Sequence, residues 1–574
     1  METIRSLDPA VQECVRTRGF SRLSDVQEQS IPLVREGRNL VLIAPTGTGK
    51  TESAMIPVFD AMRSHPASGF LTLYITPLRS LNRDMLQRLA WWCRELDLTV
   101  GVRHGDTSQS ERRKQALSPP DLLITTPETL QAMFMGKVLR RHLANVRYVV
   151  VDEIHELAGS KRGAQLAVAL ERLVEYSGEF QRIGLSATVG NPEEMGRFLC
   201  GARPFQVVSV PVAKHLEISV DFAGDRFEKQ ADWVSREIDR HASTLIFVNT
   251  RVTAEALGHH LFTRGDVEVH HGSLSKEVRI EAEERFKSGA IKALICTSSM
   301  ELGIDIGRIE HVIQFGSPRE VARLVQRVGR AGHQLEAVSR GTILATGFDD
   351  LLESLVIAHR AKAGLVEKVT PHRNAADVLA NQVAAMAVEY REVSRERVRE
   401  VIGRSYPFQI SGSLLDDVVS QMAEHGLVRV EGDLIRSSGR SRKYLAGNLS
   451  MIHDERKMAI YDMVSRKTVG TLDESFVVGW VHTGAVFITK GQLWRVLDME
   501  DGRITVEPAR KAKGELPSWE GEQIPVPFPV AREVGALRKS RDFARYQPND
   551  TTLRFALRFL REMDRNRSPV ATDT

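Results

Sequence analysis

The sequence predicts an α/β protein with two tandem doubly wound domains, each built on a parallel sheet. Short apolar runs of four to six residues alternate with helical stretches through the first 210 residues, and the alternation starts again near residue 244. The runs carry Val, Ile and Leu without polar alternation, which is typical of strands buried on both faces of a sheet. The 574 residues exceed what one core holds, so about three to five domains are expected.

Each half has five predicted strands. In the first half they are Asn39–Ala44, Leu71–Thr76, Leu122–Thr125, Tyr148–Asp152 and Arg182–Ser186. In the second half they are Thr244–Asn249, Glu268–His270, Ala293–Thr297, His311–Gln314 and Thr342–Ala345. The segments between them suit crossover helices. Two prolines mark 202–217 as the linker, so the predicted domains span 1–208 and 209–370.

The pattern changes after His372. Three short helices are predicted at Asp377–Tyr390, Ser394–Arg404 and Gly412–His425, and two apolar runs then flank a Glu431-Gly432 turn. A glycine in a two-residue loop between apolar runs predicts a β-hairpin. Three helices and a hairpin predict a winged-helix domain over 371–446, with a small helical bundle as the alternative.

Residues 447–574 are predicted to form a small β-rich module with an Arg-rich helical tail and a disordered end. Its predicted strands are Ala459–Met463, Thr468–Leu472, Phe476–Val481, Ala485–Thr489, Gln492–Leu497 and Ile504–Pro508. Trp480 and Trp494 lie in apolar runs and are expected in the core, whereas Trp519 in a loop could equally stack on bases. The basic run Arg436–Lys443 is either a nucleic-acid contact or a solvated loop.

Composition narrows the class of protein. The net charge of +4 neither requires nor excludes a polyanionic partner. Four widely spaced cysteines form no CxxC pair, so neither a disulfide framework nor a zinc site is expected, and a reducing compartment fits. The sequence shows no signal-peptide pattern and no apolar run of the roughly 18 residues that a membrane span needs. A cytoplasmic protein is therefore expected.

Residues Ala44–Thr51 predict a phosphate-binding loop between a strand and a helix. Backbone N–H groups of such a loop and of the following helix suit a triphosphate. Lys50 would place a positive charge on the β- and γ-phosphates, and the Thr51 hydroxyl would bind Mg²⁺. A chance glycine-rich turn is the alternative, which the Lys-Thr pair disfavours. The expected cofactors are ATP and Mg²⁺, and the loop residues assigned to them are Thr46, Gly47, Thr48, Gly49, Lys50 and Thr51.

Two further groups complete the predicted chemistry. Asp152 at a strand end is expected to bind Mg²⁺, and Glu153 is expected to orient the attacking water. Gln326, Arg327 and Arg330 follow in the second domain. The two arginines, three residues apart on one face of a helical turn, would act as arginine fingers on ATP held between the two domains. A solvated basic helix face is the alternative.

Nine blocks, in order, resemble the motifs of superfamily 2 nucleic-acid helicases of the DExH type, whose two domains are RecA-like. These blocks are Phe20 with Gln27, Ala44–Thr51, Thr76–Arg79, Thr125–Glu128, Asp152–His155, Ser186–Thr188, Phe247–Arg251, Thr297–Asp305 and Gln326–His333.

The rest of the chain resembles the large helicase-related (Lhr) family. The resemblance rests on the Gly-His that ends the last block, the winged-helix pattern, and the segments Leu472–Phe476, Trp494–Val496 and Pro517–Glu522. It implies ATP-dependent 3′-to-5′ translocation on single-stranded DNA, unwinding of DNA or RNA:DNA duplexes, and a role in DNA repair or recombination. Family members usually continue well beyond the last segment, whereas this sequence ends at Thr574, so a short or truncated form is expected.

The resemblance also assigns roles to single residues. Gln27 would read adenine and Phe20 would stack on it, while Gly303 and Asp305 would contact the nucleotide from the second domain. Ser186 and Thr188 would couple ATP to the strand. The residues that would hold phosphates of one strand are Thr76, Arg79, Thr126, Arg251 and Thr297. Such contacts predict salt-sensitive binding without sequence preference.

Two other functions remain open at this point. An ATP-dependent RNA helicase of the Ski or DEAH type shares the DExH motifs, although the winged-helix and Trp-Glu-Gly-Glu segments favour the Lhr alternative. A nucleic-acid-binding scaffold with a vestigial ATPase is disfavoured by the intact catalytic set, namely Lys50, Asp152, Glu153, Arg327 and Arg330. Oligomeric state and pathway stay open, and polarity rests on the resemblance alone.

Overall fold

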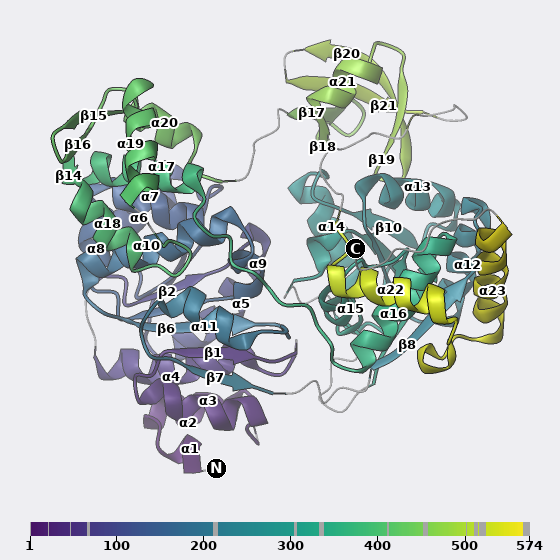
Figure 1. The fold of residues 1–574 in the computed structure, drawn as a ribbon, viewed down its shortest axis with the longest axis horizontal. Helices are drawn as coiled ribbons and strands as arrows, with labels where there is room; N and C mark the ends of the chain where they lie inside the picture. The colour runs from purple at the N-terminus through teal and green to yellow at the C-terminus, as the bar shows by residue number, and fades with distance from the viewer. Residues whose placement is uncertain are drawn as a thin grey trace. The chain divides into compact units, whose positions relative to one another are not determined.

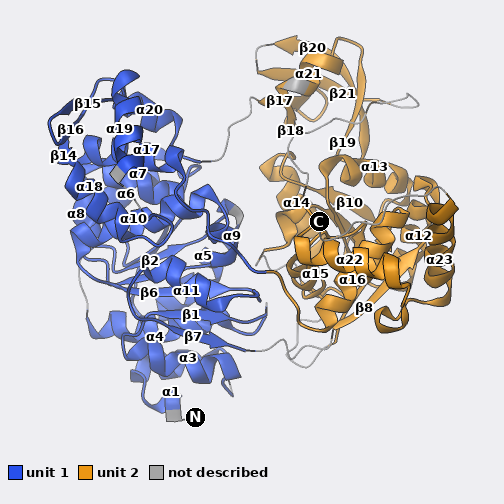
Figure 2. Cartoon of the chain, in the orientation of Figure 1, with its two compact units in different colours: residues 1–211, 368–453 blue, residues 212–367, 454–574 orange. Residues whose placement is uncertain are grey.

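The computed structural model describes residues 2–20, 22–45, 47–65, 69–210, 216–302, 307–331, 338–409, 412–451, 457–500, 502–509, 515 and 524–565. The chain forms two compact units, each made from two stretches of sequence (Figure 2). Unit 1 comprises residues 1–211 and 368–453, and unit 2 comprises 212–367 and 454–574. Figure 1 labels the elements of both units.

A seven-stranded parallel sheet organises unit 1, with strand order β3-β4-β2-β5-β6-β1-β7. Its strands are β1 Leu40–Ile43, β2 Thr72–Ile75, β3 Val100–Arg103, β4 Leu122–Thr125, β5 Tyr148–Val151, β6 Gln181–Ser186 and β7 Gln206–Ser209. The five predicted strands are all present. The edge strands β3 and β7 were not predicted, because they are less apolar and less buried than the central ones, and β7 falls in the predicted linker.

Helices pack on both faces of this sheet and bury two apolar clusters, one on each face. They are α1 Glu2–Arg5, α2 Pro9–Thr17, α3 Asp25–Arg35, α4 Lys50–Ser64, α5 Arg79–Glu95, α6 Gln109–Leu117, α7 Pro127–Met135, α8 Lys137–Leu143, α9 Ile154–Ala158, α10 Lys161–Ser177 and α11 Pro192–Cys200. The alternation of strand and helix is the doubly wound arrangement that the sequence predicts.

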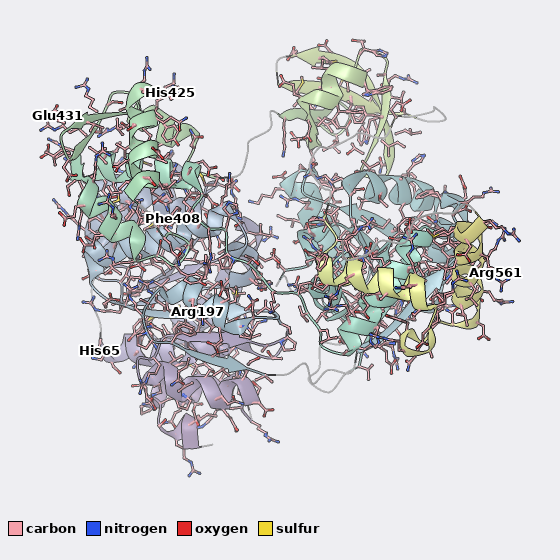
Figure 3. All side chains as sticks on the ribbon, viewed as in Figure 1. His65, Arg197, Phe408, His425, Glu431 and Arg561 are labelled. Atoms are coloured by element: carbon pink, nitrogen blue, oxygen red, sulfur yellow. The ribbon has the colours of Figure 1, made fainter. Side chains whose placement is uncertain are left out.

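A winged-helix domain completes unit 1 and confirms the prediction from the three helices and the hairpin. Its elements are α17 Ala376–Tyr390, β14 Glu392–Ser394, α18 Arg395–Gly403, α19 Gly412–Glu424, β15 Val428–Glu431, β16 Leu434–Ser437 and α20 Ser441–Gly447. The three strands form an antiparallel sheet. An ion pair between Arg172 of α10 and Glu389 of α17, both fully buried, joins this domain to the first one. Figure 3 shows Phe408 inside this part of unit 1, where it is buried.

Unit 2 is built on a six-stranded parallel sheet with order β10-β11-β9-β12-β13-β8. The strands are β8 Leu216–Phe222, β9 Thr244–Val248, β10 Val267–His270, β11 Ala293–Cys296, β12 His311–Phe315 and β13 Ser339–Ala345. The main helices are α12 Phe227–Arg240, α13 Arg251–Leu261, α14 Lys276–Lys287, α15 Val321–Val328 and α16 Phe348–Lys362, with short 3-10 turns η1 Phe262–Arg264 and η2 Ser298–Met300. The strand β8 was not predicted, because as an edge strand it alternates apolar and polar residues.

The β-rich module of unit 2 has strand order β18-β17-β21-β20-β19. The strands are β17 Lys457–Asp462, β18 Lys467–Asp473, β19 Val486–Thr489, β20 Gln492–Glu500 and β21 Arg503–Pro508. The helical tail forms α22 Phe528–Ser540, η3 Ala544–Tyr546 and α23 Asp550–Arg565, and α23 packs on β8 and α16 through ring contacts of Phe555 and Phe559. Arg561 extends from the exposed face of α23 (Figure 3).

The predicted strand Phe476–Val481 is wrong, because the chain forms helix α21 (Glu474–Trp480) there. Its apolar residues split between two environments: Phe476 and Val477 are buried, whereas Val478 and Trp480 face solvent. Trp480 is 60% exposed, so its predicted place in the core is also wrong. Trp494 is 4% exposed and its indole Nε1 donates to the Thr489 carbonyl at 2.8 Å, which confirms its place in the core.

Within the described residues, no helix combines the length and the apolar character that crossing a membrane requires. All four cysteines are buried free thiols.

Candidate functional site

The predicted motifs of unit 1 gather at one edge of its sheet. Because β1 to β7 are parallel, their carboxyl ends share an edge, and ligand sites of doubly wound sheets lie there. The motif residues follow β1, β2, β4, β5 and β6 in turn. They are the loop after Ile43, Thr76 after β2, Thr126 after β4, Asp152 after β5 and Ser186 at the end of β6.

The loop between β1 and α4 depends on two glycines. Gly47 and Gly49 have φ of +79° and +84°, a region that only glycine occupies without strain. A Cβ on Gly49 would also lie 2.5 Å from the Gln27 Nε2 atom. The loop is therefore closely fitted to helix α3, and substitution of Gly49 would both strain the backbone and displace Gln27.

The first turn of helix α3 is connected to the same loop by a hydrogen bond. The Ser24 hydroxyl donates to the Thr48 carbonyl at 3.0 Å, and the Ser24 N–H donates to the Gln27 side-chain oxygen at 3.0 Å. Phe20 is half-buried against Trp92, with ring centroids 6.3 Å apart. Of the two residues predicted to recognise adenine, Gln27 thus adjoins the loop, and adenine recognition itself stays a prediction.

Lys50 and Thr51 begin helix α4, and both side chains are mostly buried. The Lys50 ammonium donates to the Ala44 carbonyl at 2.6 Å, so it lies inside the curve of the loop. A cation at this position, beside the amino end of a helix, attracts a phosphate.

Asp152 lies beside Thr51, and Tyr74 connects them. The Tyr74 hydroxyl donates to the Asp152 Oδ2 atom at 2.7 Å and also interacts with the Thr51 side chain. Burial, followed by the adjacent charge of Glu153, raises the pKa of Asp152 to about 6. The sequence pattern does not predict this role of Tyr74, because a tyrosine within an apolar strand is expected to be an ordinary core residue. The Thr51 hydroxyl and the Asp152 carboxylate offer the oxygen ligands that Mg²⁺ prefers. A cation at this place would also offset the repulsion between the buried carboxylates of Asp152 and Glu153.

Glu153 is held in a strained conformation next to this carboxylate. Its φ of +46° is rare for a non-glycine residue, and its N–H donates to Asp152 Oδ1 at 2.9 Å. His155 Nδ1 lies 3.7 Å from Glu153 Oε2 and 3.2 Å from the Ser186 hydroxyl. The histidine therefore connects the Asp152–His155 motif to the Ser186–Thr188 motif, which is the connection that coupling through Ser186 requires. Thr188 is half-buried nearby in sequence, and its coupling role stays a prediction.

The residues predicted to hold phosphates in unit 1 have different environments. Arg79 is exposed and paired with Asp106 at 2.8 Å. Thr126 precedes helix α7, with its hydroxyl 3.2 Å from that of Thr129. Thr76 is fully buried, and its hydroxyl donates to the Leu78 carbonyl at 3.0 Å, so this side chain shapes the loop. Phosphate contact by all three stays a prediction.

Arg162 joins the two loops that carry these residues, and sequence reasoning missed it. Its Nε donates to Glu128 Oε1 at 2.6 Å, and its Nη2 donates to the Pro77 carbonyl at 2.7 Å. The guanidinium fork therefore fixes the loop after β2 against the start of α7. Glu128 belongs to the motif Thr125–Glu128, but no sequence pattern connects it to Arg162 on α10.

In unit 2, Glu301 organises two arginines, Arg327 in α15 and Arg330 in the turn that follows this helix. Arg327 is 1% exposed, and its Nε donates to the Glu301 carboxylate at 2.7 Å, with further bonds to Asn249 and Gln314. Arg330 donates to the Glu301 backbone carbonyl at 3.2 Å. Gln326 is also buried. The solvated basic face is thereby excluded for the two arginines, and their role as arginine fingers stays a prediction.

The other predicted strand contacts of unit 2 also follow strand ends. Arg251 starts α13 after β9, and its guanidinium donates to the Ser273 hydroxyl at 2.9 Å. Thr297 follows β11 and is buried. Four residues with predicted roles lie outside the described residues, namely Thr46, Gly303, Asp305 and Trp519.

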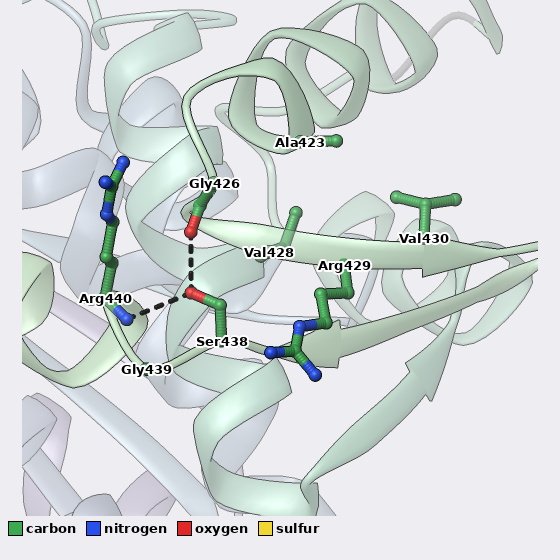
Figure 4. Close-up of a pocket in the computed structure, with 8 residues that line it drawn as sticks. All are labelled: Ala423, Gly426, Val428, Arg429, Val430, Ser438, Gly439 and Arg440. Carbon is green, nitrogen blue, oxygen red and sulfur yellow. Dashed lines mark hydrogen bonds between the residues drawn. The ribbon is translucent and has the colours of Figure 1, made fainter.

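A shallow pocket of about 530 Å³ opens in the winged-helix domain (Figure 4). Its lining includes Arg429 and Arg440, and the Ser438 hydroxyl donates to the Gly426 carbonyl at 2.7 Å. Within the predicted basic run, Arg436 pairs with Glu392 and Glu431, whereas Arg442 and Lys443 are exposed. Ion pairing of Arg436 thus leaves only part of that run available to a polyanion.

Comparison with known proteins agrees with this geometry. Three family models match: DEAD/DEAH box helicase over residues 24–195, helicase conserved C-terminal domain over 227–334, and large helicase-related protein, winged helix domain, over 359–516. ATP-dependent helicase Lhr-Core protein 2 of Thermococcus barophilus is 34% identical over 93% of this chain and 67% of its own. ATP-dependent helicase Lhr-Core of Methanothermobacter thermautotrophicus is 33% identical over 98% of this chain and 71% of its own.

A solved structure is similar along the whole chain. It is Mycobacterium smegmatis helicase Lhr bound to single-stranded DNA and AMP-PNP, with a TM-score of 0.79 and 29% identity over 98% of this chain and 74% of that one. The two RecA-like sheets and the phosphate loop define an ATP-dependent helicase of the DEAD/DEAH-box class. Within that class, the chain belongs to the large helicase-related (Lhr) family.

Proposed function

We propose that this helicase translocates 3′-to-5′ on single-stranded DNA and unwinds DNA or RNA:DNA duplexes, with ATP and Mg²⁺ as cofactors. The observation that carries the proposal is the single edge of the unit 1 sheet that holds both the phosphate loop and the predicted strand-binding loops. If a nucleotide and a nucleic-acid strand both bind at this edge of the sheet, each can influence the other through side-chain contacts such as those of His155 with Glu153 and Ser186.

The chemistry assigned to unit 1 is ATP hydrolysis. Lys50 and the loop backbone would bind the phosphates, Thr51 and Asp152 would hold Mg²⁺, and Glu153 would orient the attacking water. Mg²⁺ supplies charge neutralisation of the phosphates when it is bound. The Tyr74 hydroxyl keeps Thr51 and Asp152 together, and His155 connects Glu153 to Ser186.

The strand would be held through its phosphates. Arg79 is exposed and Thr126 lies at a helix start, where N–H groups favour phosphate oxygens. The related helicase of Mycobacterium smegmatis was solved with single-stranded DNA, which supports DNA as the strand. A role in DNA repair and a cytoplasmic location are part of the same proposal, as are the domain limits 1–208, 209–370, 371–446 and 447–574.

ATPase assays with different polynucleotides test the proposal. We expect hydrolysis by the wild-type protein to be stimulated by single-stranded DNA and to fall as salt rises, because phosphate contacts release counterions. Lys50→Ala should lose hydrolysis and keep strand binding. Full ATPase activity in Lys50→Ala would defeat the assignment of the phosphate loop, and stimulation by RNA alone would favour the Ski or DEAH type of helicase.

A further inference from the structure

A second cluster of ligand-type side chains lies in unit 2, at the amino end of β12. Glu237 and His241 lie one helical turn apart at the end of α12, and His311 is the first residue of β12. One possible ligand atom from each residue lies within 4.8 Å of the other two. His241 Nε2 is 3.8 Å from Glu237 Oε2, and the two imidazole rings stack with centroids 4.4 Å apart.

A hydroxyl group orients His311. The residue is 7% exposed, and its Nε2 lies 3.2 Å from the Thr342 hydroxyl, which in turn lies 2.8 Å from the Ser219 hydroxyl. A hydrogen on Nε2 leaves the lone pair on Nδ1. Among the described residues, this buried Nδ1 atom has no hydrogen-bond partner. A buried polar atom without a partner costs free energy and calls for an explanation.

The two oxygens of the Glu237 carboxylate face different partners. Arg240 pairs with Glu237 through Oε1 at 2.6 Å, so the oxygen nearer His241 is the other one, Oε2.

From this geometry we propose that Glu237, His241 and His311 bind a divalent transition-metal ion of the Zn²⁺ class. Two imidazoles and one carboxylate are a ligand set of Zn²⁺ sites, which leaves a fourth position for water. Hard cations such as Mg²⁺ take oxygen ligands and do not suit two histidines. The hydroxyl behind His311 is the outer partner that metal-binding histidines use to fix their orientation.

Binding requires one movement. Stacked rings keep their lone pairs in two nearly parallel planes, with an angle of 12° between the rings, whereas the lone pairs of two ligands must converge on one ion. His311 is buried and held by Thr342, so the His241 ring, with 23% of its side chain exposed, is the one that turns. Cysteine spacing predicts no zinc site, and the three residues of this cluster are too far apart in sequence to form a local metal-binding pattern.

This cluster is separate from the predicted motifs of unit 2. His311 begins β12, whereas Arg251 and Thr297 follow the carboxyl ends of β9 and β11. Since all strands of this sheet are parallel, the cluster and those motif residues lie at opposite edges. Metal binding can therefore be tested independently of the ATPase.

Calorimetric titration with Zn²⁺ alone tests the site. The full chain is stripped with a chelator, dialysed and titrated, and we expect one ion per chain. His241→Ala should weaken the affinity at least tenfold. His260→Ala is the matched control and should bind as wild type does. His260 lies in the same unit on α13, where it neighbours Asp232 and packs edge-on against Phe227, and it is not one of the three proposed ligands.

Glu237→Gln keeps the side-chain volume and serves as the second variant. If circular dichroism shows that His241→Ala is unfolded, the Zn²⁺ affinity of Glu237→Gln tests the site instead. Co²⁺ titration adds a spectroscopic readout: a visible d–d band should form in wild type and be lost in both variants. The proposal is overturned if wild type binds no ion, or if the folded variants bind Zn²⁺ with wild-type stoichiometry and affinity.

Discussion

Glu255 of α13 and His271 after β10 share a hydrogen bond of 2.7 Å, and both side chains are fully buried. The same carboxylate accepts hydrogen bonds from the Lys490 and Gly491 backbone N–H groups, at 2.8 and 2.6 Å, in the turn between β19 and β20. His271 lies two residues from Ser273, which accepts a hydrogen bond from Arg251. One buried carboxylate therefore joins the β-rich module to the helix that begins with a predicted strand-binding arginine.

We expect Glu255→Gln to destabilise unit 2. The amide carries no charge, and its NH₂ group would face backbone N–H donors, so at least one of the two N–H groups would lose its partner. Hydrogen bonds to charged groups contribute about 1.5–3 kcal/mol each, so a loss of about 2 kcal/mol or more is expected in the free energy of unfolding. Urea denaturation measures this. Glu284→Gln, at an exposed position on α14, should cost under about 0.5 kcal/mol, and equal losses in the two variants would contradict the anchoring role of Glu255.

Arg162→Ala should weaken the binding of single-stranded DNA. Without the guanidinium, the Pro77 carbonyl and the Glu128 carboxylate lose their common partner, and the loops that carry Arg79 and Thr126 separate. A loss of about 1.4 kcal/mol in binding free energy, which is part of the energy of these charged hydrogen bonds, corresponds to about a tenfold increase in Kd. Fluorescence anisotropy with a labelled oligonucleotide measures it. Arg113→Ala, at an exposed position on α6, removes the same charge and should change Kd far less; similar increases would mean that only net charge matters.

The two tryptophans of the β-rich module should respond in opposite ways to truncation. Trp494→Ala removes a buried ring and should cost about 3–5 kcal/mol, whereas Trp480→Ala removes an exposed one and should change stability by under about 0.5 kcal/mol. Thermal unfolding of both variants gives the comparison. A large loss for Trp480→Ala would show that its ring is packed against the protein and that helix α21 is misassigned.

The buried thiols provide a test that depends on pH. Burial raises the pKa of Cys93 and of Cys200 to about 12, against about 8.5 for a free thiol. The protonated thiol is favoured by folding, so this contribution to stability is complete below about pH 8.5 and is lost as pH rises toward 12. With a disulfide reagent at pH 8, we expect negligible labelling of the folded protein and four reactive thiols after denaturation. Rapid labelling of the native protein would contradict this packing.

Much of the fold could be predicted because buried strands of parallel sheets have an unmistakable composition. β1, β2, β4 and β5 are runs of apolar residues that end in motif residues. Edge strands such as β3 and β8 carry polar residues on one face, so their composition resembles that of loops. The error at 476–481 has the same origin: a short apolar run does not distinguish a strand from a helix of two turns with one solvent-exposed side.

The candidate site was predictable where residues adjacent in sequence act together. Lys50 and Thr51, or Asp152 and Glu153, carry their chemistry in a local pattern. Tyr74, Arg162 and Glu255 act through partners far along the chain, and no spacing rule connects them. The same limit applies to His311, whose metal-type partners lie on another element.

Strand displacement on duplexes with either a 3′ or a 5′ single-stranded overhang tests the central proposal most directly. With ATP and Mg²⁺, the wild-type protein should displace the partner strand only when a 3′ overhang is present on the loading DNA strand, whether that partner is DNA or RNA. Lys50→Ala should displace neither. Displacement that requires a 5′ overhang, or that occurs only when the loading strand is RNA, would contradict 3′-to-5′ translocation on single-stranded DNA.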